Sequence, residues 1–461
     1  MLILKKWISG IALASLCVST AYGATNSDAN LVEKASFAKS LDDLQTGSNK
    51  IDVMLEGNLT REEAAVLIVE ALGYKSLAAN YENSNSFKDV TTHKGEINLV
   101  KALGLMNGTS QNAFNPKAYV SAESAKTIIS RIQAKLETPL KWQHACYAIS
   151  SSSQMDRITN YDAISFGWAS LAYNNGDFSV STTSGDFKVP SSFEIPVDLA
   201  QNNGVETYLM VYYDNKDNAV NKLFTDQAKR NQLIKELVSL CNGVTKEGQT
   251  RSFDGLTIDF EQFYSSDLKA PYMTFLKELK AALAAQGKKL NVAVQPTTNF
   301  KGYDYKGIGE VADHVILMAH DYGAKTLTAN DQAAGTTNTP ITPIKAVYGT
   351  LEEAVNAISN KDKIALQISY ASVQWQVKNN KVTNSSAFTP SYAQIQSRLN
   401  TVGTTIHFDE TTQDTYATYE ADGMKNVIWY EDQRSTQAKI DLAKLLGITS
   451  VSYWRLGNMP N

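Results

Sequence analysis

The first third of the chain shows short amphipathic patterns separated by polar turns. Apolar residues recur at helical spacing over residues 59–74, where Thr60 and Glu63 fit a capping box and Gly73 fits a helix stop. Two more helical stretches follow, at residues 96–108 and 121–132. The pattern predicts a small all-helical domain over residues 35–135, which ends in a short polar link.

From about residue 143 the pattern changes to apolar, strand-like runs with amphipathic helices between several of them. The runs are residues 145–149, 163–168, 207–213, 255–261, 290–295, 314–320, 363–370 and 450–454. This pattern predicts an α/β domain over residues 143–461 that folds as a (β/α)8, or TIM, barrel. An open doubly wound sheet is the alternative, although no G-x-G-x-x-G loop follows the first strand.

The first 23 residues are typical of a secretory signal. Lys5 and Lys6 precede an apolar run, and Ala21 and Gly23 supply the small residues of a cleavage site after Gly23. The apolar run is too short to span a membrane comfortably. We therefore expect a secreted protein that has no membrane contact after cleavage, and an uncleaved anchor is the alternative.

Composition and charge exclude some classes of protein. With 43 % hydrophobic and 20 % charged residues, the chain is typical of a globular protein. A net charge of −4 offers no basic field for nucleic acid. Cys146 and Cys241 could pair in a secreted protein, but they do not form a disulfide framework. His314 and His320 have no evident third ligand, so we expect no metal and no cofactor.

One predicted strand, residues 255–261, carries acids where a buried strand is usually apolar. Alternation places Thr257, Asp259 and Glu261 on one face and apolar residues on the other. In a barrel the three would point inward, with Glu261 at the carboxyl end, where barrel active sites form. Burial and a neighbouring acid favour a proton on Glu261 near neutral pH, which suits protonation of a glycosidic oxygen. The alternative is a structural polar pair satisfied by hydrogen bonds.

The same stretch carries a family resemblance. DGLTIDFE, at residues 254–261, resembles the D-G-x-D-x-D-x-E signature of glycoside hydrolase family 18, the chitinase family. It is more similar still to the D-G-x-N-I-D-F-E form of the spore-germination and cortex-lytic branch. Three further stretches resemble the M-x-Y-D element and the closing motifs of that branch: LMAHDYG at 317–323, WYEDQRS at 429–435 and SYWRLGN at 452–458. The match runs from about residue 147 to the end.

The resemblance implies a substrate-assisted mechanism in which the acetamide of the sugar is the nucleophile. It implies Glu261 as the acid/base and Asp259 as the partner of the acetamide. Asp321, together with Met318 of the same element, would contact the acetamido region. Trp454 would form the floor under the sugar, because an aromatic face stacks on sugar C–H groups.

Two positions depart from the family pattern. Thr257 replaces an Asp or Asn, and it can donate a hydrogen bond to Asp259 but cannot exchange charge with it. His320 stands where the tyrosine of M-x-Y-D would be; a neutral imidazole can donate one bond, and Tyr322, expected on the same face, could substitute instead. Gln295, at the end of the fifth strand, could bind sugar. Three aromatic residues at strand ends or loop starts could line subsites: Trp168, Tyr212 and Trp375.

The helical domain resembles the S-layer homology domain. The stretches that carry this resemblance are LTREE at 59–63, FKDV at 87–90 and NAFNP at 112–116. The match covers roughly residues 38–133, about one full unit and a partial one. The family anchors proteins to cell-wall polysaccharide, often through an arginine that corresponds to Arg61; Ala122 stands at that position in the second copy. A helical domain without a ligand is the alternative.

Together these features predict a secreted, cell-wall-associated hydrolase of β-linked N-acetylglucosamine glycans, with peptidoglycan favoured, acting as a monomer. A chitinase with the same mechanism is the first alternative. A non-catalytic glycan-binding barrel is the second: Asp259 and Glu261 argue against it, whereas Thr257 and His320 argue for it. A purely structural surface-layer protein would not need inward acids.

Overall fold

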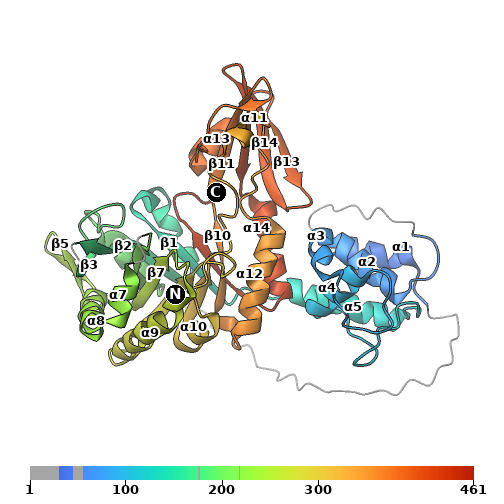
Figure 1. Cartoon of the computed structure of the whole chain (residues 1–461), viewed down its shortest axis with the longest axis horizontal. Coiled ribbons are helices and arrows are strands. Elements are labelled where there is room, and N and C mark those ends of the chain that lie inside the picture. Colours follow the sequence, from blue (N-terminus) through green and yellow to red (C-terminus); the bar gives the residue numbers. More distant parts are fainter. Residues whose placement is uncertain (1–30, 45–54, 175–176, 217–218, 461) are drawn as a thin grey trace, which may run out of the picture.

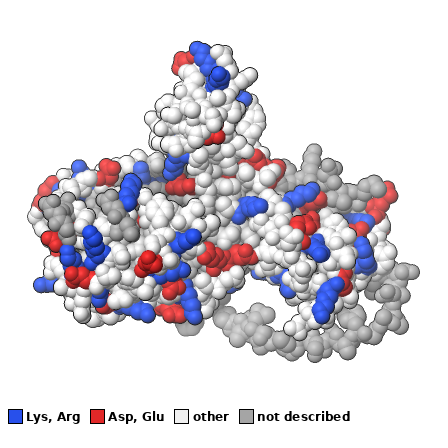
Figure 2. Space-filling model, in the orientation of Figure 1, with Lys and Arg blue, Asp and Glu red and all other residues white. Residues whose placement is uncertain are grey.

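The computed structural model describes residues 31–44, 55–174, 177–216 and 219–460 (Figure 1). The expected signal segment, residues 1–23, lies outside these residues. Within the described ranges, no helix combines the length and apolar character that crossing a membrane requires. On the face shown in Figure 2, acidic and basic side chains of the described residues are interspersed rather than gathered by sign.

In the described part of the chain, eight parallel strands close into a barrel. They are β1 (Trp142–Tyr147), β2 (Ala163–Asn174), β4 (Glu206–Asp214), β7 (Gly255–Glu261), β8 (Lys289–Val294), β9 (His314–Leu317), β10 (Ile364–Ser369) and β16 (Ser450–Trp454). β1 pairs with both β2 and β16, which closes the ring. The (β/α)8 prediction is confirmed, and the open doubly wound sheet is wrong because this ring has no free edge.

Helices cover the outside of the barrel. They are α6 (Glu194–Asn202), α7 (Val220–Thr225), α8 (Gln227–Asn242), α9 (Lys269–Ala284), α10 (Tyr305–Val311), α12 (Ile344–Ala357) and α14 (Gln433–Leu445). The predicted alternation of β7 explains why they pack there. Phe260 points outward and stacks on Phe275 of α9 with the ring centroids 6.0 Å apart. Thr257 and Asp259 are buried on the inner face.

The end of the barrel opposite the carboxyl ends of the strands is filled by stacked rings. Trp142 lies nearly parallel to His144 on one side, at 5.0 Å between ring centroids, and to His314 on the other, at 3.8 Å. Tyr208 is fully buried in the same interior cluster. The barrel is therefore packed below its upper cavity and is not a pore.

A five-stranded antiparallel sheet is inserted between β10 and β16 (Figure 1). Its elements are β11 (Ser372–Lys378), β12 (Lys381–Val382), β13 (Thr405–Asp409), β14 (Asp414–Ala421), β15 (Met424–Tyr430) and α13 (Tyr392–Leu399). The sequence did not predict this subdomain, because strands with one wet face lack the continuous apolar runs of barrel strands. Smaller elements elsewhere are β3 (Asp177–Ser181), β5 (Val244–Lys246), β6 (Gln249–Arg251) and α11 (Ala329–Ala333).

Two tryptophans expected near subsites are packing residues instead. Trp375 is fully buried in the inserted subdomain, where its indole N–H donates to Thr339 Oγ1 at 2.8 Å. Trp168 is also fully buried, with its ring 4.5 Å from that of Phe166 and 6.1 Å from that of Phe193. Both expectations are wrong, because a strand-end position says nothing about which face a bulky ring takes.

Three buried charges hold the inserted subdomain against α14. Lys439 of α14 places Nζ 2.9 Å from Asp414 Oδ1 of β14 and 3.4 Å from Oε1 of Glu431, which follows β15. All three residues are at most 5 % exposed. Asp432 caps α14 through a capping box with Ser435. Charges this deep are tolerated only when paired, so the triad ties the subdomain to the barrel helix.

The N-terminal helices form the predicted domain beside α12 and α14 (Figure 1). They are α1 (Lys34–Asp42), α2 (Arg61–Ala71), α3 (Lys75–Ala78), α4 (Lys94–Ala102) and α5 (Ala122–Leu136). The capping box of Thr60 with Glu63 is confirmed at the start of α2. Gly73 follows α2 with φ of 70°, the left-handed conformation of a helix stop.

This domain is docked onto the barrel by hydrogen bonds. The Gln413 side chain donates to the carbonyls of Leu72 and Gly73 at 3.1 and 3.0 Å. Lys135 Nζ donates to the carbonyl of Leu445 at 2.6 Å. The Tyr81 hydroxyl bonds both Tyr348 and Glu352 of α12.

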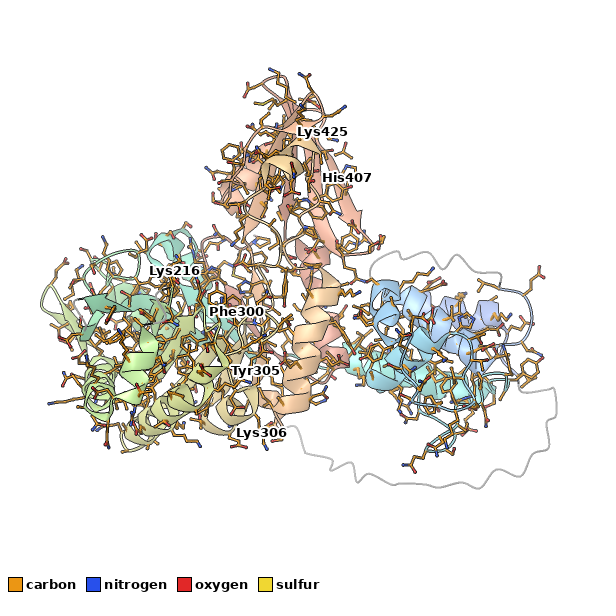
Figure 3. All side chains as sticks on the ribbon, viewed as in Figure 1. Lys216, Phe300, Tyr305, Lys306, His407 and Lys425 are labelled. Atoms are coloured by element: carbon orange, nitrogen blue, oxygen red, sulfur yellow. The ribbon has the colours of Figure 1, made fainter. Side chains whose placement is uncertain are left out.

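Replacing Lys439 with methionine leaves Asp414 and Glu431 buried without a cation. We expect the free energy of unfolding to fall by about 3–5 kcal/mol, measured by urea denaturation. The matched control is Lys425→Met, at an exposed position of the inserted subdomain (Figure 3). Its free energy of unfolding should stay within about 0.5 kcal/mol of the wild type. Equal effects of the two variants would contradict the role of the triad.

Candidate active site

A cavity of about 200 Å³ lies inside the barrel at the carboxyl ends of the strands. It brings together these residues predicted from the sequence: Thr257, Asp259, Glu261, Met318, His320, Asp321 and Trp454. A larger cleft of about 970 Å³ lies where the N-terminal domain meets α14. The smaller cavity is the candidate active site, because barrel active sites form at this end of the strands and the inward acids of β7 meet here.

Asp259 and Glu261 carry perturbed carboxyl groups. Asp259 is 5 % exposed, and its Oδ1 has no hydrogen-bond partner among the described residues. Burial, and then the charge of Glu261, raise the pKa of Asp259 well above its usual value. Burial also raises the pKa of Glu261 to about 7, against the opposing effect of His320. The pair therefore holds a proton near neutral pH, and Asp259 keeps one buried oxygen without a hydrogen-bond partner among the described residues.

Gln295 holds Glu261 in place. Its Nε2 donates to Glu261 Oε2 at 3.2 Å, and its Oε1 accepts from the backbone N–H of Gln262 at 2.6 Å. It does not belong to the cavity lining. Gln295 therefore contacts and orients the acid, and sugar binding by Gln295 stays a prediction.

His320 and Asp321 contact each other in the same cavity as Asp259 and Glu261. His320 Nε2 bonds Gln367 Oε1 at 2.8 Å, and its Nδ1 lies 3.3 Å from Asp321 Oδ2. Lys325 Nζ lies 3.0 Å from the other Asp321 oxygen. Burial opposes both charges, but the contact with His320 and the Lys325 charge outweigh it and hold the pKa of Asp321 far below its usual value. For His320 likewise, Asp321 outweighs burial and raises the pKa.

Tyr322 is absent from the cavity lining, and the expectation that it shares a face with His320 is wrong. Its hydroxyl bonds Thr350 Oγ1 of α12 at 2.7 Å. The cause is that β9 ends at Leu317, so strand alternation does not extend to these positions. Asp321 adopts a left-handed φ of 61°, which turns the chain between the two residues. His320 is the one of the two that lines the cavity.

Thr257 bonds a different partner from the one expected. Its Oγ1 lies 2.7 Å from Ser165 Oγ, and the described residues show no hydrogen bond between Thr257 and Asp259. Ser165 in turn bonds His144. The sequence analysis missed both residues, although each is a polar side chain inside an apolar barrel strand, which is the signal that could have found them.

Other lining residues complete the cavity. Tyr212 lies on the wall, as expected, stacked on Phe187 with ring centroids 4.3 Å apart. Phe187 comes from a Ser- and Gly-rich loop that gave no signal. Cys146 lies in the lining, and Cys146 and Cys241 are both buried free thiols, so the disulfide left open by the sequence is not formed.

Residues 143–458 match the sequence model of the glycosyl hydrolases family 18. The chain belongs to this family. Residues 86–121 match the S-layer homology domain, which is associated with the cell surface. The family 18 match and the closed barrel agree with the resemblance carried by residues 254–261.

The curated relatives are named cortical fragment-lytic enzymes and glycosylases of Bacillus. The chain is 28 % identical over 251 residues to the cortical fragment-lytic enzyme of Bacillus subtilis, covering 52 % of this chain and 55 % of that one. It thus spans about half the length of the curated relatives that it matches.

Solved structures share the barrel fold. The spore cortex-lytic enzyme SleL of Bacillus cereus has a TM-score of 0.56 at 20 % identity, covering 69 % of this chain and 71 % of that one. A chitinase of Chromobacterium violaceum has a TM-score of 0.57 at 18 % identity, with 69 % and 95 % covered. A chitinase-like agglutinin of Robinia pseudoacacia has a TM-score of 0.54 at 18 % identity, with 69 % and 96 % covered.

Arg61, the expected wall-binding residue, is engaged within its own domain. Its guanidinium donates to the carbonyls of Phe114, at 2.8 Å, and Asn107, at 2.7 Å. It also lies over the Phe114 ring, 4.5 Å from the centroid. Burial lowers the pKa of Arg61, and Asp89 opposes that effect.

The raised pKa of Glu261 makes stability depend on pH. The unfolded chain loses this proton near 4.5, whereas the folded chain keeps it to about 7, so folding loses stability as pH rises between these values. Glu261→Gln removes this loss. We expect the melting temperature of Glu261→Gln to exceed that of the wild type at about pH 8, with the difference shrinking toward about pH 4.

The matched control for this stability measurement is Glu310→Gln, an exposed acid of α10 outside the cavity, which should not raise the melting temperature at about pH 8. A pH-independent difference between Glu261→Gln and the wild type would contradict the raised pKa of Glu261.

Proposed function

We propose that the protein hydrolyses β-linked N-acetylglucosamine glycans, with peptidoglycan as the favoured polymer, by substrate-assisted hydrolysis with retention. The observation that carries the proposal is the pair Asp259 and Glu261 in one cavity, one with an unpartnered buried oxygen and the other holding a proton. A general acid must be protonated before the glycosidic bond breaks, and the environment of Glu261 meets this need.

In the first step Glu261 gives its proton to the glycosidic oxygen as the C1–O bond breaks. The acetamide oxygen of the same sugar forms a bond to C1, and the ring so formed carries the positive charge. A carboxylate oxygen of Asp259 accepts the acetamide N–H, which orients the nucleophile and compensates this charge. Trp454 lies under the sugar ring, and His320 lies beside the acetamide.

In the second step Glu261, now a carboxylate, takes a proton from water. The water oxygen bonds to C1 and the bond from the acetamide oxygen breaks, which restores the N-acetyl group and the protonated Glu261. Two inversions at C1 give net retention. No nucleophile from the protein is required.

The likeness to cortex-lytic enzymes and the S-layer homology unit both support a bacterial wall glycan as substrate. A secreted, wall-associated monomer is part of this proposal. A chitinase is the second candidate, supported by the similarity to a solved chitinase. A binding barrel without catalysis is the third, supported by the agglutinin and by Thr257 and His320.

Glu261→Gln keeps the shape of the site but cannot donate this proton. We expect it to lower the rate of glycan cleavage by about 10²–10⁴. Wild type, Glu261→Gln and the Glu310→Gln control are assayed on purified peptidoglycan and on chito-oligosaccharides, with the products identified by mass spectrometry.

The preferred polymer in these assays decides between peptidoglycan hydrolase and chitinase. Binding of one glycan without cleavage by the wild type would contradict the hydrolase proposal and support the binding barrel.

Arg61 is proposed to contribute to wall binding through the S-layer homology unit. We expect Arg61→Met to reduce co-sedimentation of the full-length protein with purified cell walls. Arg131→Met is the matched control, because Arg131 also donates to a backbone carbonyl of the domain, that of Leu105, at 2.6 Å. Equal loss from both variants would show that folding of the domain, and not Arg61, is what matters.

A further inference from the structure

A continuous chain of buried polar side chains runs around the barrel, from the cavity wall through the layer beneath it and back to the wall. It joins side chains from different strands in the order His320, Gln367, Ser452, His144, Ser165 and Thr257. The successive contacts are 2.8, 3.3, 2.8, 2.7 and 2.7 Å. One end lies beside Glu261 and the other lies one layer below Asp259 on the same face of β7.

The direction of this chain is fixed by Gln367. An amide oxygen can only accept and an amide nitrogen can only donate. Since Gln367 Oε1 faces His320 Nε2, that nitrogen carries a hydrogen, and since Gln367 Nε2 faces Ser452, the Ser452 oxygen accepts.

The direction then passes through His144. Ser452 has one hydrogen to donate, and among the described residues His144 Nδ1 is the acceptor within its reach. His144 therefore carries its own hydrogen on Nε2 and donates it to Ser165, whose hydroxyl in turn donates to Thr257 Oγ1. The hydroxyl hydrogen of Thr257, at the end of the chain, has no acceptor within the chain.

Asp259 lies two residues further along the same inner face of β7, and no hydrogen bond joins it to Thr257 among the described residues. Its Oδ1 is buried and has no hydrogen-bond partner among the described residues. We infer that Gln367, Ser452, His144 and Ser165 form a relay that holds the Thr257 hydroxyl as a donor available to Asp259. The relay thereby sets the donor available to the carboxylate that orients the acetamide, and its members are positioning residues. The relay itself does not depend on the proposed function; only its expected effect on kcat does.

The charged and titratable groups around the relay leave its middle neutral. Burial, and then His314 across Trp142, lower the pKa of His144 to about 3. Burial lowers the pKa of His314 to about 4. The groups that face the two ends are Glu261, Asp321, Lys325, Asp259 and the Cys146 thiol, which lies 4.0 Å from Gln367 Nε2. The groups that can change protonation with the pH of the medium therefore lie at the two ends of the relay.

The state of the His144 ring tests the relay directly. In full-length protein labelled with ¹⁵N-histidine, we expect His144 to be neutral, protonated on Nε2 and bare on Nδ1, at neutral pH. Ser452→Ala removes the donor to Nδ1, so the ring-nitrogen signals of both His144 and His320 should move. Ser450→Ala is the matched control: it lies on the same strand and is also buried, but it bonds the carbonyl of Asp362 and should move neither signal.

Kinetics give the second readout. Ser452→Ala should lower kcat roughly 2- to 10-fold with KM nearly unchanged, the effect of losing one neutral hydrogen bond. Ser450→Ala should leave kcat within about twofold.

A His144 ring protonated on Nδ1 in the wild type overturns the relay, whether or not any variant folds. Signals of His144 and His320 that are unmoved in a folded Ser452→Ala protein overturn it too. If the rings have the expected states but no glycan is cleaved, the relay stands and the proposed function fails.

Discussion

Every polar side chain that points into the closed barrel must find its hydrogen-bond partner inside the barrel. Water is excluded below the cavity by the stacked rings of Trp142, His144 and His314, and an unpaired polar group there is costly. Ser165, Ser452 and the other members of the relay meet this constraint by bonding one another across strands. Some groups have no partner among the described residues: both polar atoms of the Asn291 amide, deep in the barrel, and Asp259 Oδ1, where the cavity begins. Of these two residues, Asp259 is the one that lines the cavity.

The same chain buries charge in two different ways. At Lys439 the two carboxylates are matched by a cation, and the result is a fixed joint between the inserted subdomain and α14. At Asp259 and Glu261 no cation lies between the acids, and burial raises the pKa of both, as it also raises the pKa of Glu431 to about 7. The two sites differ in their surroundings: the Lys439 triad is enclosed and joins two parts of the fold, whereas Asp259 and Glu261 line a cavity.

Local patterns predicted the parts of the fold that local physics decides. The alternation in residues 255–261 set the faces of β7, and the capping box set the start of α2. Tyr322 was misassigned because the end of β9 depends on the turn at Asp321 and on contacts with α12, neither of which has a sequence period. The relay was missed for a related reason: His144 and Ser452 lie far apart in the chain, and only closure of the barrel brings them together.

Helix α12 contacts both the N-terminal domain and the loop that carries the candidate active-site residue Asp321. Its Tyr348 and Glu352 receive Tyr81 of the N-terminal domain, and its Thr350 holds the Tyr322 hydroxyl next to Asp321. The N-terminal domain is therefore held against α12 by side-chain contacts and not only by the chain that connects it to the barrel. If this domain binds the wall, as proposed, these contacts would orient the mouth of the barrel relative to the wall. Such an arrangement would present the cavity to one layer of the wall and would limit how far from that layer the cavity can act.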